Sequence, residues 1–207
     1  MNAPAGLWSL VVGDDQVADE VDVRIIEAAL EQFTLVGIKR ASTDDIARRA
    51  GVNRTTLYRR MGSKDAIVRA AVLYEVRRML TRIEAEIGEI TDVAERIAEG
   101  CATTVTLLRE NALLKHLLAV DRDEILPQVT IDAGAALRAG TFFVADQIRR
   151  ARTELGLPDP PDVDGLAAIL VRLVHSLVLI PDGPPDLETR EQLREFARLH
   201  ILPMITT

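Results

Sequence analysis

The sequence predicts an all-α protein. Apolar residues recur at spacings of three and four along almost every segment, and no run alternates apolar with polar residues as a strand would. Capping residues and glycines fall between these periodic segments, where helices begin and end. The 207 residues are enough for one large or two small domains. With 48% apolar but only 3% aromatic residues, the core must consist mainly of Leu, Ile, Val and Ala.

The N-terminal part of the chain predicts three helices. The first covers residues 21–37, has one apolar face and ends at a glycine. A short helix over 43–50 follows, for which Ser42 is a suitable N-cap. Asn53 then caps a second short helix, over 54–60. The residues expected to join these helices in one small core are Ile25, Ile26, Ala29, Leu30, Phe33, Ile46, Ala47, Ala50, Val52, Leu57 and Met61.

Longer helices are predicted for the rest of the chain. Ser63 and Asn111 are suitable N-caps, and Pro127 is expected in the first turn of a long helix. The stretches GLPDPPDVDG and PDGPPD separate the last segments as linkers. The predicted helices cover residues 64–88, 91–109, 111–120, 127–155, 163–180 and 187–202.

The short helix over residues 54–60 raises the first functional question. Isolated helices below roughly 12–15 residues are marginal in water, so packing on the first helix must hold it. Its basic and polar residues then face outward. Two short helices joined by a tight glycine-containing turn, the second with a basic face, are typical of a DNA-binding helix-turn-helix. Residues 36–64 contain eight basic and two acidic residues, although the chain's net charge is −7.

Residues 25–68 resemble the DNA-binding domain of the TetR family of bacterial transcriptional regulators. The motifs that carry this resemblance are AALEQF (28–33), Gly37, DIARRAGVNRTTLY (45–58) and GSKDAIV (62–68). Thr43 stands where the family usually has an apolar residue, and Met61 where it usually has an aromatic one.

The resemblance implies a ligand-responsive regulator that binds double-stranded DNA. It most often implies a repressor that leaves an inverted-repeat operator when a small molecule binds the C-terminal domain. By the same resemblance, the residues expected to contact phosphates or support docking are Ser42, Thr56, Tyr58 and Lys64. Those expected to read or approach bases are Arg54, Thr55, Arg59 and Arg60.

We expect an N-terminal extension over residues 1–19, a helix-turn-helix domain over 20–66 and a helical effector-binding and dimerisation domain over 67–207. The helix over 163–180 is apolar on nearly every side, which predicts contact with a second subunit. Together with the last helix it would form a four-helix bundle across a two-fold axis, the dimer mode that the resemblance also implies. The residues predicted for this interface are Leu166, Leu170, Leu173, Leu177, Leu193, Phe196, Ala197 and His200.

The C-terminal domain is expected, again by resemblance, to enclose an effector pocket. Ordinary core packing is the alternative role for each candidate lining residue. These candidates are Cys101, Val105, Leu108, His116, Leu117, Phe142, Phe143, Arg172 and His175.

Other functional classes find little support in the sequence. It contains no glycine-rich phosphate loop or nucleophile elbow, and its three histidines lack metal-binding spacing, so we predict no enzyme, cofactor or metal site. Asp121, Asp123 and Glu124 are interpreted as a solvated loop. The remaining alternative is a helical ligand- or protein-binding module without operator binding. The absence of a signal peptide or membrane span predicts a cytoplasmic protein.

Overall fold

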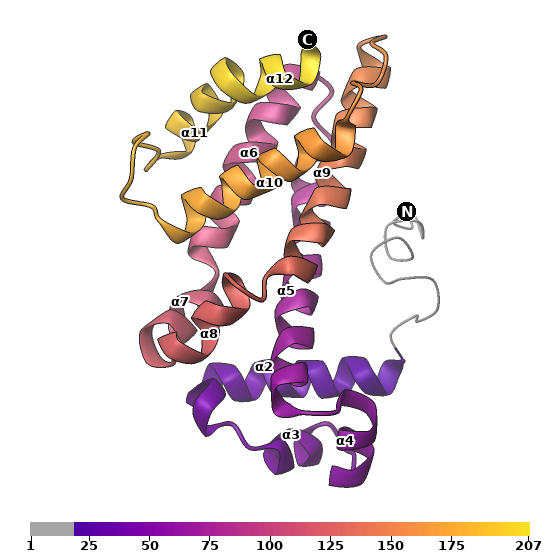
Figure 1. Cartoon of the computed structure of the whole chain (residues 1–207), viewed down its shortest axis with the longest axis vertical. Coiled ribbons are helices and arrows are strands. Elements are labelled where there is room, and N and C mark those ends of the chain that lie inside the picture. Colours follow the sequence, from indigo (N-terminus) through magenta and orange to yellow (C-terminus); the bar gives the residue numbers. More distant parts are fainter. Residues whose placement is uncertain (1–18) are drawn as a thin grey trace. The chain divides into compact units, whose positions relative to one another are not determined.

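The structure, a computed structural model, describes residues 19–207. The predicted extension up to residue 18, with Trp8, lies outside the described residues. The described part is helical and contains no strand, as predicted (Figure 1). It divides into two compact units. The head comprises residues up to Val76 together with Asn111–Ala136, and the body comprises Arg77–Glu110 together with Leu137–Thr207.

The head contains the three predicted N-terminal helices and two more from the middle of the chain. Both short helices and their N-caps were predicted, whereas the first helix continues for one turn beyond a break at Gly37. A long helix, α5, begins in the head and continues into the body. The helices that lie in the head, wholly or in large part, are α2 Glu20–Arg40, α3 Thr43–Arg49, α4 Arg54–Met61, α5 Lys64–Ile87, α7 Ala112–Val120 and α8 Arg122–Val129. The head also includes the first residues of α9 Gly134–Glu154, up to Ala136.

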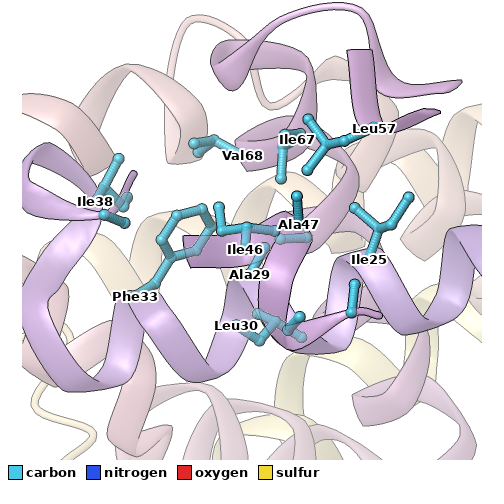
Figure 2. Close-up of a cluster of buried hydrophobic side chains, with 14 of the residues drawn as sticks. Ile25, Ala29, Leu30, Phe33, Ile38, Ile46, Ala47, Leu57, Ile67 and Val68 are labelled. Atoms are coloured by element: carbon cyan, nitrogen blue, oxygen red, sulfur yellow. The ribbon is translucent and has the colours of Figure 1, made fainter. Parts of the chain in front are cut away.

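The head has one hydrophobic core, shown in Figure 2. Of the predicted core residues, Ile26, Val52 and Met61 are partly buried and the others are buried. The helices α7 and α8 complete this core, because Leu117 and Ile125 are buried in the same cluster. That contribution was not predicted from the sequence. It makes the middle of the chain a structural part of the head.

The body consists of the second half of α5 and the remaining helices. Two helix predictions were wrong, one at the border of head and body and one within the body. Pro127 does not begin the long helix but lies inside the short α8, and the predicted helix over 187–202 is divided by a π-helical segment. The body helices are α6 Val93–Glu110, α9 Gly134–Glu154, α10 Val163–Leu179, α11 Arg190–Phe196, the π-helix η2 Ala197–Ile201 and α12 Leu202–Thr206.

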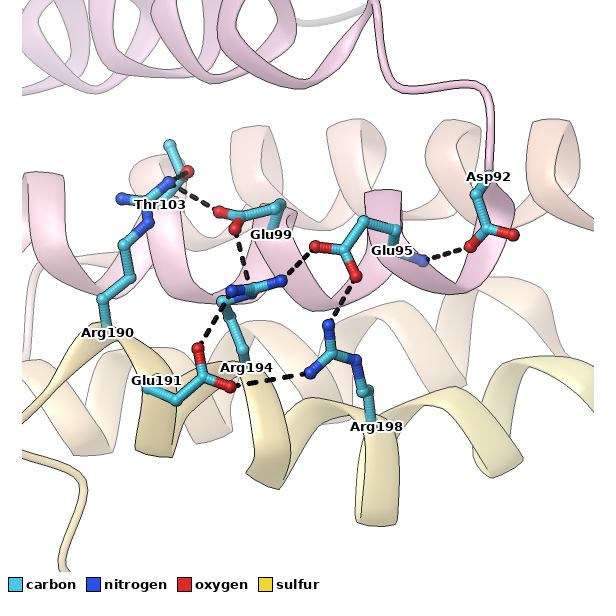
Figure 3. Close-up of polar contacts among 8 residues, drawn as sticks. All are labelled: Asp92, Glu95, Glu99, Thr103, Arg190, Glu191, Arg194 and Arg198. Carbon is cyan, nitrogen blue, oxygen red and sulfur yellow. Dashed lines mark hydrogen bonds and ion pairs between the residues drawn. The ribbon is translucent and has the colours of Figure 1, made fainter.

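An ion-pair network joins α6 to α11 and η2, as Figure 3 shows. Glu95 on α6 accepts hydrogen bonds from Arg194 and from Arg198, the latter at 2.5 Å. Glu99, one turn further along α6, pairs with Arg190 at 2.6 Å and with Arg194 at 2.9 Å. These hydrogen bonds, that of Arg198 first, lower the pKa of Glu95. The carboxylates of α6 are therefore bound by guanidinium groups of both α11 and η2.

Arg152 is buried at the C-terminal end of α9, with 4% of its surface exposed. Its guanidinium donates to the carbonyl oxygens of Pro158 and Ile205, at 2.5 and 2.6 Å. A buried charge needs such partners, since an unpaired one is costly. Arg152 thereby fixes the α9–α10 connection and α12 to the same point.

Among the described residues, none of the helices combines the length and apolar content that a membrane crossing requires.

Candidate DNA-binding surface

The scaffold of this surface is α3, a tight turn and α4. The Ser42 hydroxyl accepts a hydrogen bond from the Asp45 amide at 3.1 Å, which begins α3. The Asn53 side chain accepts from the Thr56 amide at 2.8 Å, which begins α4. Gly51, with φ +68°, adopts the left-handed conformation that the turn between them requires. The local sequence thus fixes both ends of this turn.

One side chain anchors α4 to the rest of the head. Leu57 is fully buried in the head core, with 0% of its surface exposed. Because Leu57 faces inward, the opposite side of this eight-residue helix faces solvent. Thr56 is half-buried, and the remaining predicted DNA-contacting residues of α4 are exposed: Arg54, Thr55, Tyr58, Arg59 and Arg60.

Tyr58 and Arg54 form a connected group with α3. The Tyr58 hydroxyl is hydrogen-bonded to the Thr43 hydroxyl at 3.0 Å, and this bond lowers the pKa of the phenol. The Arg54 guanidinium lies 5.4 Å from the centre of the Tyr58 ring and pairs with Asp44 at 3.0 Å. Thr43, the polar residue at a usually apolar position, therefore orients a predicted phosphate contact.

Arg60 is held by two carboxylates at the start of α2. Its guanidinium lies 2.7 Å from Asp19 and 2.9 Å from Asp22. The hydrogen bonds to these carboxylates, that to Asp22 first, raise the pKa of Arg60. Arg59, the preceding residue in the chain, has no ion-pair or hydrogen-bond partner within the described part of the protein. The two adjacent guanidinium groups therefore differ in how tightly the protein itself binds them.

Lys64 is the first residue of the 24-residue helix α5 and is half-buried. The preceding Ser63 accepts a hydrogen bond from the Ala66 amide at 3.1 Å and so caps the helix. The Lys64 ammonium donates to the carbonyl oxygen of Lys39 at 3.1 Å, at the end of α2. A helix N-terminus with a lysine ammonium beside it favours an anion such as a phosphate.

All eight predicted DNA-contacting residues lie in the head, on or beside α3, α4 and the start of α5. The carboxylates of Asp19, Asp22 and Asp44, which form ion pairs with Arg60 and Arg54, were not predicted from the sequence. Asp44 was visible in sequence as an acidic residue inside the basic segment. Nothing in the sequence pairs Asp22 with Arg60, because 38 residues separate them.

The candidate effector-binding residues divide between the two units. His116 and Leu117 belong to the head and the other seven to the body. Leu117 and Val105 are buried in the hydrophobic cores of head and body, and Phe143 is also buried. Phe142 and Arg172 are exposed, whereas Leu108 and His175 are half-buried. Cys101 packs in the body, where burial raises the pKa of its thiol to about 11.

The residues predicted for the dimer interface all lie in the body. Four of them are already buried within the chain and have little surface left for a partner: Leu170, Leu177, Leu193 and Ala197. Leu166, Leu173 and Phe196 are half-buried and His200 is exposed. Larger apolar surface is left on residues that were not predicted, with Ile169 58% and Leu199 62% exposed.

Comparison with known families agrees with this geometry. Residues 25–71 match the family described as "Bacterial regulatory proteins, tetR family". Residues 92–198, more than half of the chain, match "Bacterial Tetracyclin repressor, C-terminal domain". The chain belongs to the TetR family. It is therefore a helix-turn-helix transcriptional regulator, as the resemblance of residues 25–68 predicted.

Relatives within the TetR family cover most of the chain. An uncharacterised HTH-type transcriptional regulator of Mycobacterium tuberculosis is 29% identical over 183 residues, which cover 88% of this chain and 84% of the relative. The regulator UidR of Escherichia coli is 25% identical over 178 residues, covering 86% and 87%.

Two solved TetR-family structures have the same fold. The repressor AlkX of Dietzia superposes with a TM-score of 0.68 at 17% identity, covering 88% of this chain and 94% of AlkX. The repressor QsdR of R. erythropolis gives a TM-score of 0.69 at 17% identity, covering 92% and 97%.

Proposed function

We propose that this TetR-family protein is a repressor that binds an inverted-repeat operator as a homodimer and leaves it when a small molecule binds the body. It would act by binding and not by catalysis, in the bacterial cytoplasm where the DNA lies. The observation that carries the proposal is the surface of α4, whose exposed basic and polar side chains stand on a helix anchored by the buried Leu57.

The partners of each side chain suggest how the roles divide. Arg59 and Thr55 are exposed and would contact base edges in the major groove. Arg54 would have to exchange Asp44 for DNA before it could do the same. Lys64, Tyr58, Ser42 and Thr56 would bind or approach phosphates, which position the head without reading the sequence.

A second copy of the chain is the partner that we propose for the body. Ile169 on α10 and Leu199 on η2 expose apolar surface that a dimer would bury. Met204 on α12, 42% exposed, adds to the apolar surface of the C-terminal segment. Two heads in a dimer would then read two half-sites, separated by about one helical turn of DNA or a multiple of it.

The effector would act by shifting the population between two states of the dimer. The helix α5 is continuous from Lys64 in the head to Ile87 in the body, so it is one covalent link through which effector binding could change the state of the head. A ligand can change operator affinity only by its differential affinity for the two states. A coupling of roughly 1–3 kcal/mol would change operator affinity about 5- to 150-fold.

The test is a selection of random duplex DNA on the purified full-length protein at near-physiological salt, followed by sequencing. We expect an inverted repeat to be enriched. The complex is then challenged with the small-molecule fraction of a bacterial extract, which should release the DNA. In vitro transcription from a promoter carrying the repeat distinguishes repression from activation. Activation is the outcome to test against because one relative, FasR of Mycolicibacterium smegmatis, which is 26% identical over 132 residues, is named as a transcriptional activator.

A folded, dimeric protein that enriches no sequence, with or without prior removal of small molecules, would contradict operator binding. It would favour the ligand- or protein-binding module. Enrichment of a single half-site without a repeat would contradict the dimeric mode and leave DNA recognition intact.

A further inference from the structure

The end of α2 has an interrupted backbone. Gly37 has φ +82° and ψ +167°, which is not helical, although helical structure continues to Arg40. Such a break interrupts the helical hydrogen-bond pattern, so the amides that follow need other acceptors. The amide of Lys39 donates to the Asp121 carboxylate, at 3.1 Å from Oδ2. Asp121 lies 82 residues later in the chain, between α7 and α8.

The Asp121 carboxylate accepts a hydrogen bond from the end of α2 and does not cap its own helix, α8. Asp121 occupies the N-cap position of α8, where an aspartate ordinarily accepts a hydrogen bond from its own helix. Its side chain makes no such bond. Asp121 is half-buried, and Asp123 and Glu124 lie in the first turn of α8, so the interpretation of these three residues as a solvated loop was wrong. Figure 1 shows the α7–α8 corner at the C-terminal end of α2.

Gly37 is required for this contact in two ways. Its φ of +82° lies in the region that glycine adopts without strain. A Cβ atom at this position would lie only 2.1 Å from Oδ2 of Asp121 and 3.0 Å from its Cγ. A larger residue would therefore displace the carboxylate. The family motif glycine at position 37 and the aspartate at 121 fit together sterically.

The backbone carbonyl group of Lys39 binds Lys64, the residue predicted to contact a DNA phosphate. This carbonyl oxygen accepts the hydrogen bond from the Lys64 ammonium at 3.1 Å. Lys39 thus has an aspartate carboxylate at its amide and a lysine ammonium at its carbonyl. A shift of the end of α2 would move the acceptor that holds the Lys64 ammonium.

We propose that Asp121 is a positioning residue for DNA binding. By holding the Lys39 amide it fixes the end of α2, and thereby the Lys64 ammonium at the start of α5, in the place where a DNA phosphate docks. Asp121 does not touch the DNA. This inference rests on the proposed function, because it takes Lys64 as a phosphate contact.

The test compares operator affinity across a salt series for the full-length wild type, Asp121→Ser and Asp121→Asn. Serine is a good N-cap for α8 but too short to reach Lys39, so this variant should fold. We expect it to bind about two- to tenfold more weakly, within the range for residues sharing a hydrogen-bond network. Its salt slope should be shallower by up to about one unit, because one phosphate contact is impaired. Asparagine keeps an acceptor oxygen and should restore most of the affinity.

Two further variants make the result specific. Asp123→Ala removes the same charge two residues away on the exposed face of α8 and should bind as the wild type does. In a Lys64→Ala background, Asp121→Ser should add little further loss, since its effect passes through Lys64.

Three outcomes would overturn the proposal. One is wild-type affinity and salt slope for a folded Asp121→Ser protein, with folding checked by circular dichroism and thermal unfolding. Another is an undiminished loss from Asp121→Ser in the Lys64→Ala background. The third is a Lys64→Ala protein with unchanged affinity and slope, which would contradict the proposed phosphate contact itself. An enriched operator in the selection would in that case still support DNA recognition by α4.

Discussion

Arg59 and Arg60 are neighbours in the chain whose guanidinium groups have different surroundings. Arg60 is bound by the carboxylates of Asp19 and Asp22, while Arg59 is exposed without a partner in the described residues. An arginine can bind guanine O6 and N7 with two hydrogen bonds only if its guanidinium is available. We therefore infer that Arg59 reads a base and that Arg60 fixes the end of α4 to the start of α2.

This difference predicts opposite phenotypes for the two arginines. Arg59→Ala should weaken operator binding by about 1–3 kcal/mol and relax the preference at one base pair. Arg60→Ala should leave that preference unchanged and lower the melting temperature of the head. Binding titrations on systematically mutated operators and thermal unfolding measure the two effects. Arg138→Ala, which removes an exposed arginine of the body, is the control. A relaxed preference in Arg60→Ala would contradict the assignment.

Cys101 is predicted to be unreactive in the folded protein. Burial raises the pKa of its thiol from 9.0 to about 11, and the thiolate is the reactive form. At pH 8 only about one thiol in a thousand would then be ionised. Alkylation by iodoacetamide, followed by mass spectrometry, should be at least about 100-fold slower than in the urea-unfolded protein. Rapid alkylation of the folded chain would show that the thiol is accessible and ionised.

At the scale of helices, the network between α6 and α11 predicts a pH-dependent contribution to stability. The folded-state pKa of Glu95 is lowered below its ordinary value of 4.5 by its hydrogen bonds with Arg198 and Arg194. The stabilisation is therefore fully present above pH 4.5 and is lost as the pH falls through the lower, folded-state pKa.

Glu95→Gln should therefore have a lower melting temperature than the wild type at pH 7. The difference should shrink as the pH falls below 4.5 and through the lowered folded-state pKa of Glu95, where the wild-type carboxylate becomes protonated. Thermal unfolding across this pH series measures it. Glu89→Gln is the matched control, since Glu89 is exposed just beyond the end of α5. A difference that stays constant with pH would mean that packing, and not charge, distinguishes the variant.

The short helices of the head could be predicted from sequence because their signals are local. Ser42 and Asn53 accept the hydrogen bonds of their own helices, and Gly51 and Gly62 have the positive φ values of helix ends. The basic face of α4 follows in the same way, because burial of Leu57 determines which residues face solvent.

The rest of the site depends on partners distant in sequence. Lys39 and Asp121 are 82 residues apart, and no periodicity connects them. Pro127 was placed in a first helical turn, where proline is favoured, whereas Thr130 and Asp132 form the turn that separates α8 from α9. The π-helical segment η2 was missed because its apolar spacing does not differ visibly from that of an α-helix.

For the whole molecule, the apolar surface of the body predicts how a dimer can be broken without unfolding the chain. The double substitution of Ile169 and Leu199 by glutamate places charges on exposed side chains and should give a folded monomer in light scattering. Leu170→Glu and Leu177→Glu should instead destabilise the fold, because both leucines are buried in the chain.

The monomeric variant should also lose affinity for the inverted repeat while retaining weak binding to a half-site. An intact dimer after substitution at 169 and 199 would place the interface elsewhere on the protein.

The contribution of α7 and α8 to the head has a practical consequence for engineered sensors. Exchanging DNA-reading segments between regulators is a natural way to give one effector response a new operator. A graft limited to residues up to Val76 of this chain would leave behind Leu117 and Ile125, which complete its head core. The recipient's own counterparts of α7 and α8 would have to pack against that core instead. Such a chimaera would contain mismatched side chains beneath its reading helix. A graft that also transfers Asn111–Ala136 would include the two helices that complete the head core. Compatibility between regulators therefore depends on both segments, which are not contiguous in the chain.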